Sequence, residues 1–145
     1  MGNELKDSMG FIIGHTRRVI VKKLNEALTG NNIPLTYEQF IFLLILNNQT
    51  GEITQQDMAN LTGKDKSAIL RTIDILESKG LVERKGITGD RRKNTIIITR
   101  KCNAFFEKLS QIEKNTMTNL REGVSDEDYK VMVKVMLQIQ NNASK

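Results

Sequence analysis

Apolar residues recur at steps of three and four along most of the chain, and this spacing predicts a protein built mainly from helices. The first such stripe runs continuously from Leu5 to about Leu28, and Gly30, followed by two asparagines, ends the predicted helix. A second helix is expected to open at Thr36, because Thr36 and Gln39 have the spacing of a capping box. The sequence of 145 residues contains one proline, which favours long uninterrupted helices.

Two short helices joined by a tight turn are predicted next. Thr54 is expected to cap the first of them, and Thr62-Gly63-Lys64 forms the turn. Asp65 can cap the second helix, which runs to Lys79 and stops at Gly80. The apolar residues of this second helix share one face: Ile69, Ile73 and Leu76. Two consecutive helices with a glycine in the connecting turn predict a helix-turn-helix.

After Gly80 the pattern changes to that of β-strands. Residues 81–85 and 95–99 predict two strands, and the second is β-branched throughout. Residues 86–94, between them, are polar and basic, as expected of a hairpin tip. A hairpin directly behind a helix-turn-helix makes a winged helix.

The last third of the chain returns to the helical spacing. One apolar stripe comprises Phe105, Leu109, Ile112, Thr116 and Leu120. Ser125 then opens a final helix, whose apolar face comprises Tyr129, Met132, Val133, Met136 and Ile139. Without an internal repeat or a linker, residues 1–145 are expected to form a single domain. In it, residues 34–101 are the winged-helix lobe, and residues 1–33 and 102–145 supply the flanking helices.

The net charge of +5 is concentrated in one part of the chain. Residues 61–101 carry eleven basic and five acidic residues, whereas the segments on either side are close to neutral. Such a surplus is typical of a protein that binds a polyanion, and the alternative is a solvated surface that is rich in lysine. No apolar run is long enough to span a membrane and no signal segment is present, so a cytoplasmic protein is expected.

The exposed face of the second short helix carries the residue types that contact a DNA duplex. The predicted DNA-binding residues at its start are Lys64, Lys66, Ser67, Leu70 and Arg71. The lysines and the serine can bind phosphate oxygens, and Arg71 is the candidate for a bidentate contact with guanine. Leu70 either touches a thymine methyl group or packs at the fringe of the core.

The predicted hairpin tip carries three consecutive cations, Arg91, Arg92 and Lys93, on a projecting loop. A basic loop of this kind can reach the minor groove, where the negative potential favours arginine. Asp90 precedes the cations and is expected to pair with an arginine or to cap the turn, which would orient the side chain that enters the groove.

Three of these segments together resemble the MarR family of bacterial transcription regulators. They are Ser67-Ala-Ile-Leu-Arg71, the run from Asp74 to Arg84, and Gly89-Asp90-Arg-Arg92 before a strand that ends in Thr99. The motif covers residues 61–101, and the flanking helices are similar to the family's layout over the whole chain. Lys66 departs from the proline common at this position in relatives, and Cys102 departs from a glycine.

The resemblance implies an obligate homodimer with interleaved N- and C-terminal dimerisation helices. It also implies that the 65–79 helix binds the major groove and that Arg92 enters the minor groove with support from Asp90. A further implication of the resemblance is an effector cleft between the dimerisation helices and the lobe. The apolar stripes of the flanking helices give a separate argument for a dimer, because they exceed what one small lobe can cover. The alternative is a monomer in which these stripes pack only on each other. Two-fold symmetry would place two recognition helices about 34–36 Å apart, matching a palindromic site.

Two residues that occur only once have both a functional and a structural interpretation. His15 lies either in the effector cleft or at the dimer interface, where it would make a structural hydrogen bond. Cys102 is either a small packing residue or an oxidation sensor beside two cations, and packing is favoured. A single cysteine forms no internal disulfide and offers too few thiolates for a zinc finger.

The leading hypothesis is a ligand-responsive, dimeric, sequence-specific DNA-binding regulator, most often a repressor. Its expected partners are double-stranded DNA, a second copy of itself and an unknown small-molecule effector. The alternative is a winged helix that contacts an acidic protein partner. No enzymatic activity, cofactor or metal is predicted, because the sequence has one histidine, one cysteine, no phosphate-binding glycine loop and no cluster of metal ligands.

Overall fold

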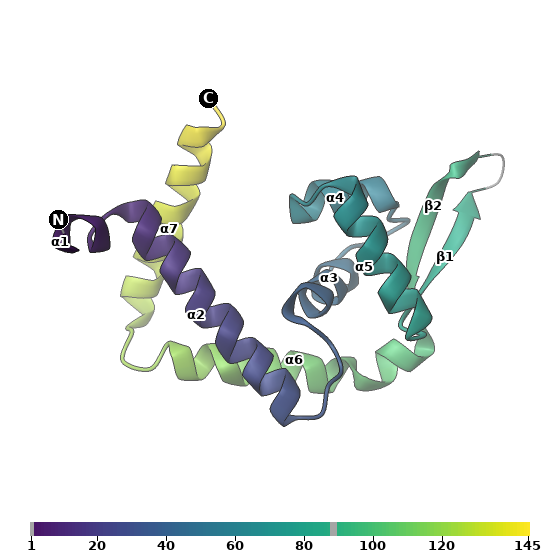
Figure 1. Cartoon of the computed structure of the whole chain (residues 1–145), viewed down its shortest axis with the longest axis horizontal. Coiled ribbons are helices and arrows are strands. Elements are labelled where there is room, and N and C mark those ends of the chain that lie inside the picture. The colour runs from purple at the N-terminus through teal and green to yellow at the C-terminus, as the bar shows by residue number, and fades with distance from the viewer. Residues whose placement is uncertain (1, 88–89) are drawn as a thin grey trace.

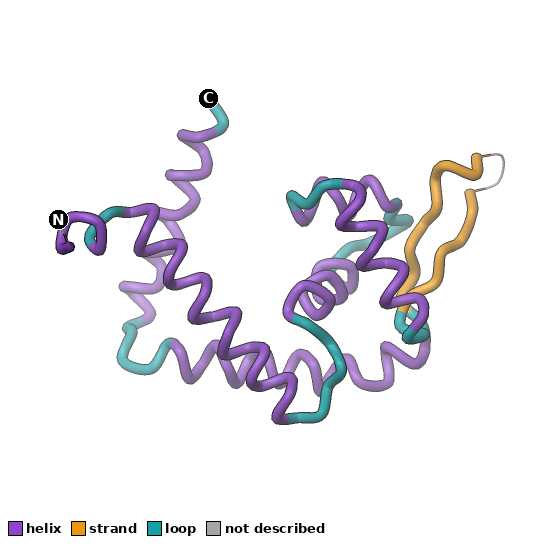
Figure 2. The backbone as a smooth tube through the Cα atoms, in the orientation of Figure 1, coloured by secondary structure: helices purple, strands orange, loops and turns teal. Residues whose placement is uncertain are grey.

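The computed structural model describes the backbone of residues 2–87 and 90–145, and the side chains of residues 4–86 and 94–145. This part of the chain forms seven helices and one two-stranded antiparallel hairpin (Figures 1 and 2). In order they are α1 (Gly2–Lys6), α2 (Met9–Gly30), α3 (Tyr37–Asn47), α4 (Gln55–Thr62), α5 (Lys66–Ser78), β1 (Val82–Ile87), β2 (Asp90–Ile98), α6 (Arg100–Leu120) and α7 (Asp126–Ala143). The predicted mainly helical winged-helix fold is confirmed.

The predicted caps lie at the starts of their helices. At α3, the Thr36 hydroxyl accepts a hydrogen bond from the N–H of Gln39 (3.3 Å), and the Gln39 amide oxygen accepts one from the N–H of Thr36 (3.2 Å). The other predicted caps also accept a backbone hydrogen bond in the first turn: Thr54, Asp65 and Ser125. Each cap satisfies backbone donors that a helix start leaves without an internal partner.

The prediction of one continuous helix from Leu5 to Leu28 is wrong at its beginning. The chain forms the short α1, leaves the helical path at Asp7 and Ser8, and restarts as α2. The Ser8 hydroxyl accepts a hydrogen bond from the N–H of Phe11 (3.3 Å) and so serves as the N-cap of α2. The spacing of apolar residues does not reveal this break, because a serine that hydrogen-bonds to the local backbone can end a helix without interrupting the apolar stripe.

The strands of the wing are longer than the sequence pattern predicts. The ladder pairs Val82 with Ile98 and continues to Gly86 and Asn94, and a register shift then brings Ile87 opposite Asp90. The backbone of residues 90–93 therefore belongs to β2, and the prediction that these residues form a projecting loop is wrong. Strand pairing uses backbone groups, so a polar and basic run can still extend a hairpin.

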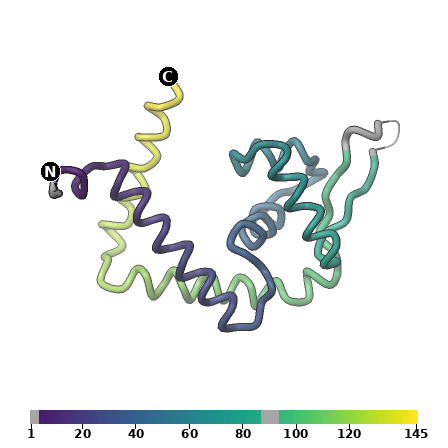
Figure 3. Tube along the Cα trace, viewed as in Figure 1, coloured from purple at the N-terminus to yellow at the C-terminus, as the bar shows by residue number. Residues whose placement is uncertain are grey.

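The core lies in the lobe formed by α3, α4, α5 and the base of the hairpin, and it extends to α2 and α6 (Figure 1). The predicted apolar face of α5 is fully buried in it: Ile69, Ile73 and Leu76. On the α2 and α6 side, the buried residues include Leu24, Leu28, Leu109 and Ile112. Helix α6 thus connects the lobe to an arm made by α2 and α7, and both chain ends lie at the end of the molecule away from the wing (Figure 3).

The arm is not covered within one chain. No residue of α7 is buried, and Met132, on the apolar face that the sequence predicts, is 44% exposed. The large exposed apolar side chains of the arm include Met9, Phe11, Ile12 and Val19 on α2 and Val131, Met132, Val135 and Leu137 on α7. No helix among the described residues has both the length and the apolar character that crossing a membrane requires.

Cys102 lies in the first turn of α6 and is fully buried in the core, as the packing interpretation predicts. Its backbone N–H donates to the hydroxyl of the N-cap Thr99 (3.2 Å). Burial removes the thiolate from water and raises the pKa of the Cys102 thiol from 9.0 to about 11.

We therefore expect Cys102 to resist iodoacetamide in the folded protein at pH 8, because the thiol is protonated and buried. Mass spectrometry of the intact chain measures the alkylated fraction over time, and the same chain unfolded in guanidinium chloride is the control that must label fully. Rapid labelling of the folded protein would instead support the sensor interpretation.

Candidate nucleic-acid interface

The turn between α4 and α5 places the first residues of α5 at the surface of the lobe. Gly63 adopts a left-handed conformation (φ +67°), which ends α4 and suits a residue without a Cβ atom. Asp65 then caps α5 by accepting from the N–H of Ala68 (2.7 Å). These two local signals fix the direction in which α5 leaves the turn.

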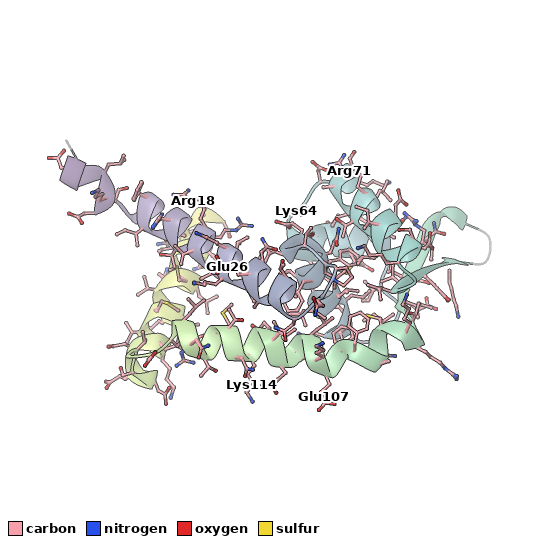
Figure 4. All side chains as sticks on the ribbon, turned by 60° about the horizontal axis from the view of Figure 1, so that its bottom comes forward. Arg18, Glu26, Lys64, Arg71, Glu107 and Lys114 are labelled. Atoms are coloured by element: carbon pink, nitrogen blue, oxygen red, sulfur yellow. The ribbon has the colours of Figure 1, made fainter. Side chains whose placement is uncertain are left out.

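The structure brings the predicted DNA-binding residues of α5 together on one exposed surface. Lys66, Ser67 and Arg71 are exposed, and Leu70 is half-buried, which is consistent with packing at the fringe of the core. In Figure 4, Arg71 projects from the side of the lobe away from α6, and Lys64 lies at the start of α5, nearer to α2. The amino group of Lys64 forms an ion pair with Glu38 of α3 (3.2 Å).

Sequence reasoning missed Arg84, the residue that joins the wing to α5. Its guanidinium donates to a carboxylate oxygen of Asp74 (2.6 Å) and of Glu77 (2.9 Å), and its Nε–H donates to the amide oxygen of Gln55 on α4 (3.0 Å). The backbone N–H of Arg84 donates to the other oxygen of Glu77 (3.0 Å). The sequence shows two acids at i, i+3 on α5 and an arginine in the strand, but not that the fold brings them together.

Backbone hydrogen bonds attach the base of the wing to the rest of the lobe. The N–H of Ile96 in β2 donates to the carbonyl of Ile53 (2.7 Å), and Thr54 pairs with Thr95 in an isolated bridge. Directly after β2, the side-chain hydroxyl of Thr99 donates to the carbonyl of Gly80 (2.6 Å). The base of the hairpin is thereby fixed against α4 and the end of α5.

The predicted wing residues fall where side chains are not described. The backbone of Asp90, Arg91, Arg92 and Lys93 lies in β2, but their side chains are outside the described residues. The minor-groove role of Arg92 and the supporting role of Asp90 therefore stay predictions.

The structure does not bring His15 to a cleft within one chain. Its side chain is exposed on α2, where the ring stacks on Phe11 with centroids 6.1 Å apart. A cavity of about 260 Å³ lies between α2, α3, α4 and α5. His15 does not line this cavity, whereas Arg17, Tyr37 and Lys64 do.

A helix-turn-helix whose second helix is tied to a β-hairpin defines a winged-helix module, and the start of its second helix is exposed in this structure. The model of the MarR family matches residues 35–93 of this chain. This match spans the helix-turn-helix and most of the wing, so the lobe is similar to the MarR family over these elements. Among the described residues, no three His, Cys, Asp or Glu side chains gather to hold a metal ion.

Solved structures of the same fold align over nearly the whole chain. The transcriptional repressor CouR bound to a 23-mer DNA duplex is similar with a TM-score of 0.86 at 20% identity, over 97% of each chain. CouR from Rhodococcus jostii bound to p-coumaroyl-CoA has a TM-score of 0.80 at 23% identity, over 93% of each chain. A mutant MarR from E. coli complexed with operator DNA has a TM-score of 0.82 at 23% identity, over 90% of this chain and 92% of that one.

Replacing Arg84 by alanine is expected to destabilise the lobe, because Asp74, Glu77 and Gln55 lose their shared donor. The Arg84 side chain is 21% exposed while the two acids are more exposed, so we expect a loss of about 1–2 kcal/mol in the free energy of unfolding. Urea unfolding followed by circular dichroism measures this loss. Arg100→Ala, at an exposed position, is the matched control and is expected to change the free energy by less than about 0.5 kcal/mol. Equal effects of the two substitutions would contradict the role assigned to Arg84.

Proposed function

We propose that this protein is a homodimeric repressor that binds a palindromic operator and releases it when a small molecule binds. The observation that carries the proposal is the exposed cationic start of α5, held by Arg84 in a fixed relation to the base of the wing. A helix of this kind fits the major groove, and a hairpin fixed beside it extends along the same duplex. CouR bound to a DNA duplex and MarR complexed with operator DNA share this fold and support the proposal.

Within this proposal, each candidate residue has a role. Arg71 contacts a guanine in the major groove, and Lys66 and Ser67 bind phosphates that set the register of the helix. Arg92 enters the minor groove with Asp90 beside it, and Arg91 and Lys93 bind the flanking phosphates.

The exposed apolar faces of the arm support the homodimer. Because α7 buries no residue within one chain, its apolar side chains would face water unless a second subunit covers them. A two-fold symmetric pairing of the arms would also present two copies of α5 to one face of the DNA. We assign His15, stacked on Phe11 of α2, to this interface rather than to an effector site.

The cavity between α2 and the helix-turn-helix is the candidate effector site. Its lining includes Arg17, Lys64 and the Glu38 carboxylate that pairs with both, together with Tyr37 and apolar residues of α3. Such a lining suits a small molecule with an apolar body and a polar or charged group. CouR bound to p-coumaroyl-CoA shows that one protein of this fold binds an acyl thioester.

Selection of bound fragments from genomic DNA by the purified protein tests the proposal. We expect enrichment of fragments that share a palindrome with half-sites one helical turn apart, and an affinity that falls steeply as salt rises.

Arg71→Ala is expected to lower affinity for the most enriched fragment about tenfold or more, through loss of the guanine contact.

Fluorescence anisotropy measures this loss of affinity. Lys114→Ala, which removes a cation from α6 on the opposite side of the lobe (Figure 4), is the control and is expected to bind like the unsubstituted protein. Weak binding without any preferred sequence would contradict sequence-specific regulation. An Arg71→Ala variant with unchanged affinity would show that α5 does not read the groove.

Met132→Asp is expected to shift the protein from dimer to monomer, because it places a charge in the apolar face of α7 that we assign to the dimer interface. Sedimentation velocity at several concentrations measures the shift. Gln138→Asp introduces the same charge at an exposed polar position of α7 and is expected to leave the dimer intact. A monomeric unsubstituted protein would refute the homodimer itself.

A further inference from the structure

Glu38 lies between two cations that come from different parts of the fold. One of its carboxylate oxygens is 3.6 Å from a guanidinium nitrogen of Arg17 on α2, and the other is 3.2 Å from the amino group of Lys64. Lys64 lies directly before α5, so the carboxylate of Glu38 holds a cation of the proposed DNA-binding surface. Sequence reasoning assigned Lys64 to DNA and gave Glu38 no role.

The position of Glu38 is fixed by the start of α3. Glu38 is in the first turn of that helix, where the helix dipole favours a negative charge, and the reciprocal hydrogen bonds of Thr36 and Gln39 hold the turn in place. Arg17 is held on a second side, since its guanidinium carbon lies 5.8 Å from the centroid of the Tyr37 ring. Of the three charged groups, Lys64 has the fewest such attachments.

The ion pair with Lys64 can be exchanged for another anion at low cost. The side chains of Lys64 and Glu38 are 45% and 49% exposed, and a pair this exposed shifts an equilibrium by about fivefold at most. The two cations occupy different oxygens of Glu38, so the carboxylate keeps Arg17 as its partner when Lys64 leaves. A DNA phosphate offers Lys64 an equivalent anion in the environment that α5 enters.

We propose that Glu38 is a positioning residue for DNA binding: it holds Lys64 in the free protein and yields it to a DNA phosphate when the duplex arrives. The inference rests on the proposed function and adds to it that the carboxylate of Glu38 competes with DNA phosphates for Lys64. Part of the energy of the Lys64–phosphate contact is spent on releasing Lys64 from Glu38. Glu38 therefore lowers the affinity for DNA, and it does so through Lys64.

The test is a double-mutant cycle on Glu38→Gln and Lys64→Gln, with binding to the most enriched genomic fragment measured by fluorescence anisotropy. Glu38→Gln is expected to tighten binding about two- to fivefold at low salt, and the gain is expected to shrink as salt screens the ion pair. In the Lys64→Gln background, the same substitution is expected to give no gain. Lys64→Gln alone is expected to cost less affinity than it costs in the Glu38→Gln background.

Glu26→Gln is the matched control, because Glu26 also pairs with a lysine, Lys23 at 3.4 Å, but on α2 away from the helix-turn-helix. It is expected to bind DNA like the unsubstituted protein. Thermal unfolding of each variant shows whether the fold is retained, as the exposed position of Glu38 leads us to expect.

Three outcomes would overturn the inference. If Glu38→Gln binds no more tightly than Glu26→Gln, Glu38 does not restrain Lys64. If the gain persists in the Lys64→Gln background, Glu38 acts by general repulsion of the DNA and not through Lys64. If the unsubstituted protein prefers no duplex, the proposed function fails and this inference fails with it, whereas the first two outcomes leave the proposed function standing.

Discussion

The relation between α5 and the wing depends on one side chain, Arg84. A two-stranded hairpin is at most marginally stable alone, so its orientation must come from contacts with the lobe. Arg84 supplies these contacts to two helices at once, because its planar guanidinium donates in several directions to Asp74, Glu77 and Gln55. A lysine has one charged nitrogen and cannot span the same three acceptors in this geometry.

We therefore expect α5 and the base of the wing to move as one body. The backbone N–H of Ile96 in β2 and the side-chain hydroxyl of Thr99, directly after β2, add two further hydrogen bonds to the lobe. A regulatory movement in this protein would therefore change how the whole lobe sits relative to α2 and α6, rather than the angle between α5 and the wing. The cavity and the Glu38 ion pairs lie at that boundary between α2 and the lobe.

Features that depend on a few neighbouring residues could be predicted from the sequence, and features that depend on distant residues could not. The caps at Thr36 and Asp65 were predicted because a cap is a contact across three residues. The break at Ser8 was missed because the apolar stripe continues through it. The network of Arg84 and the pairing of Lys64 with Glu38 join residues on different elements, and no spacing in the sequence encodes those distances.

The apolar spacing also shows that a face is apolar without showing what covers it. The stripes of α5 and α7 look alike in the sequence, yet Ile73 is fully buried while Met132 is 44% exposed. The difference arises because α5 packs inside the lobe, whereas α7 extends from the end of α6 beyond the core. The lobe is thus stabilised by contacts within one chain, and the arm has apolar area left for a second one. In the proposed homodimer, the two arms would set the spacing of the two copies of α5, so the dimer contact would determine which palindrome the proposed repressor can bind.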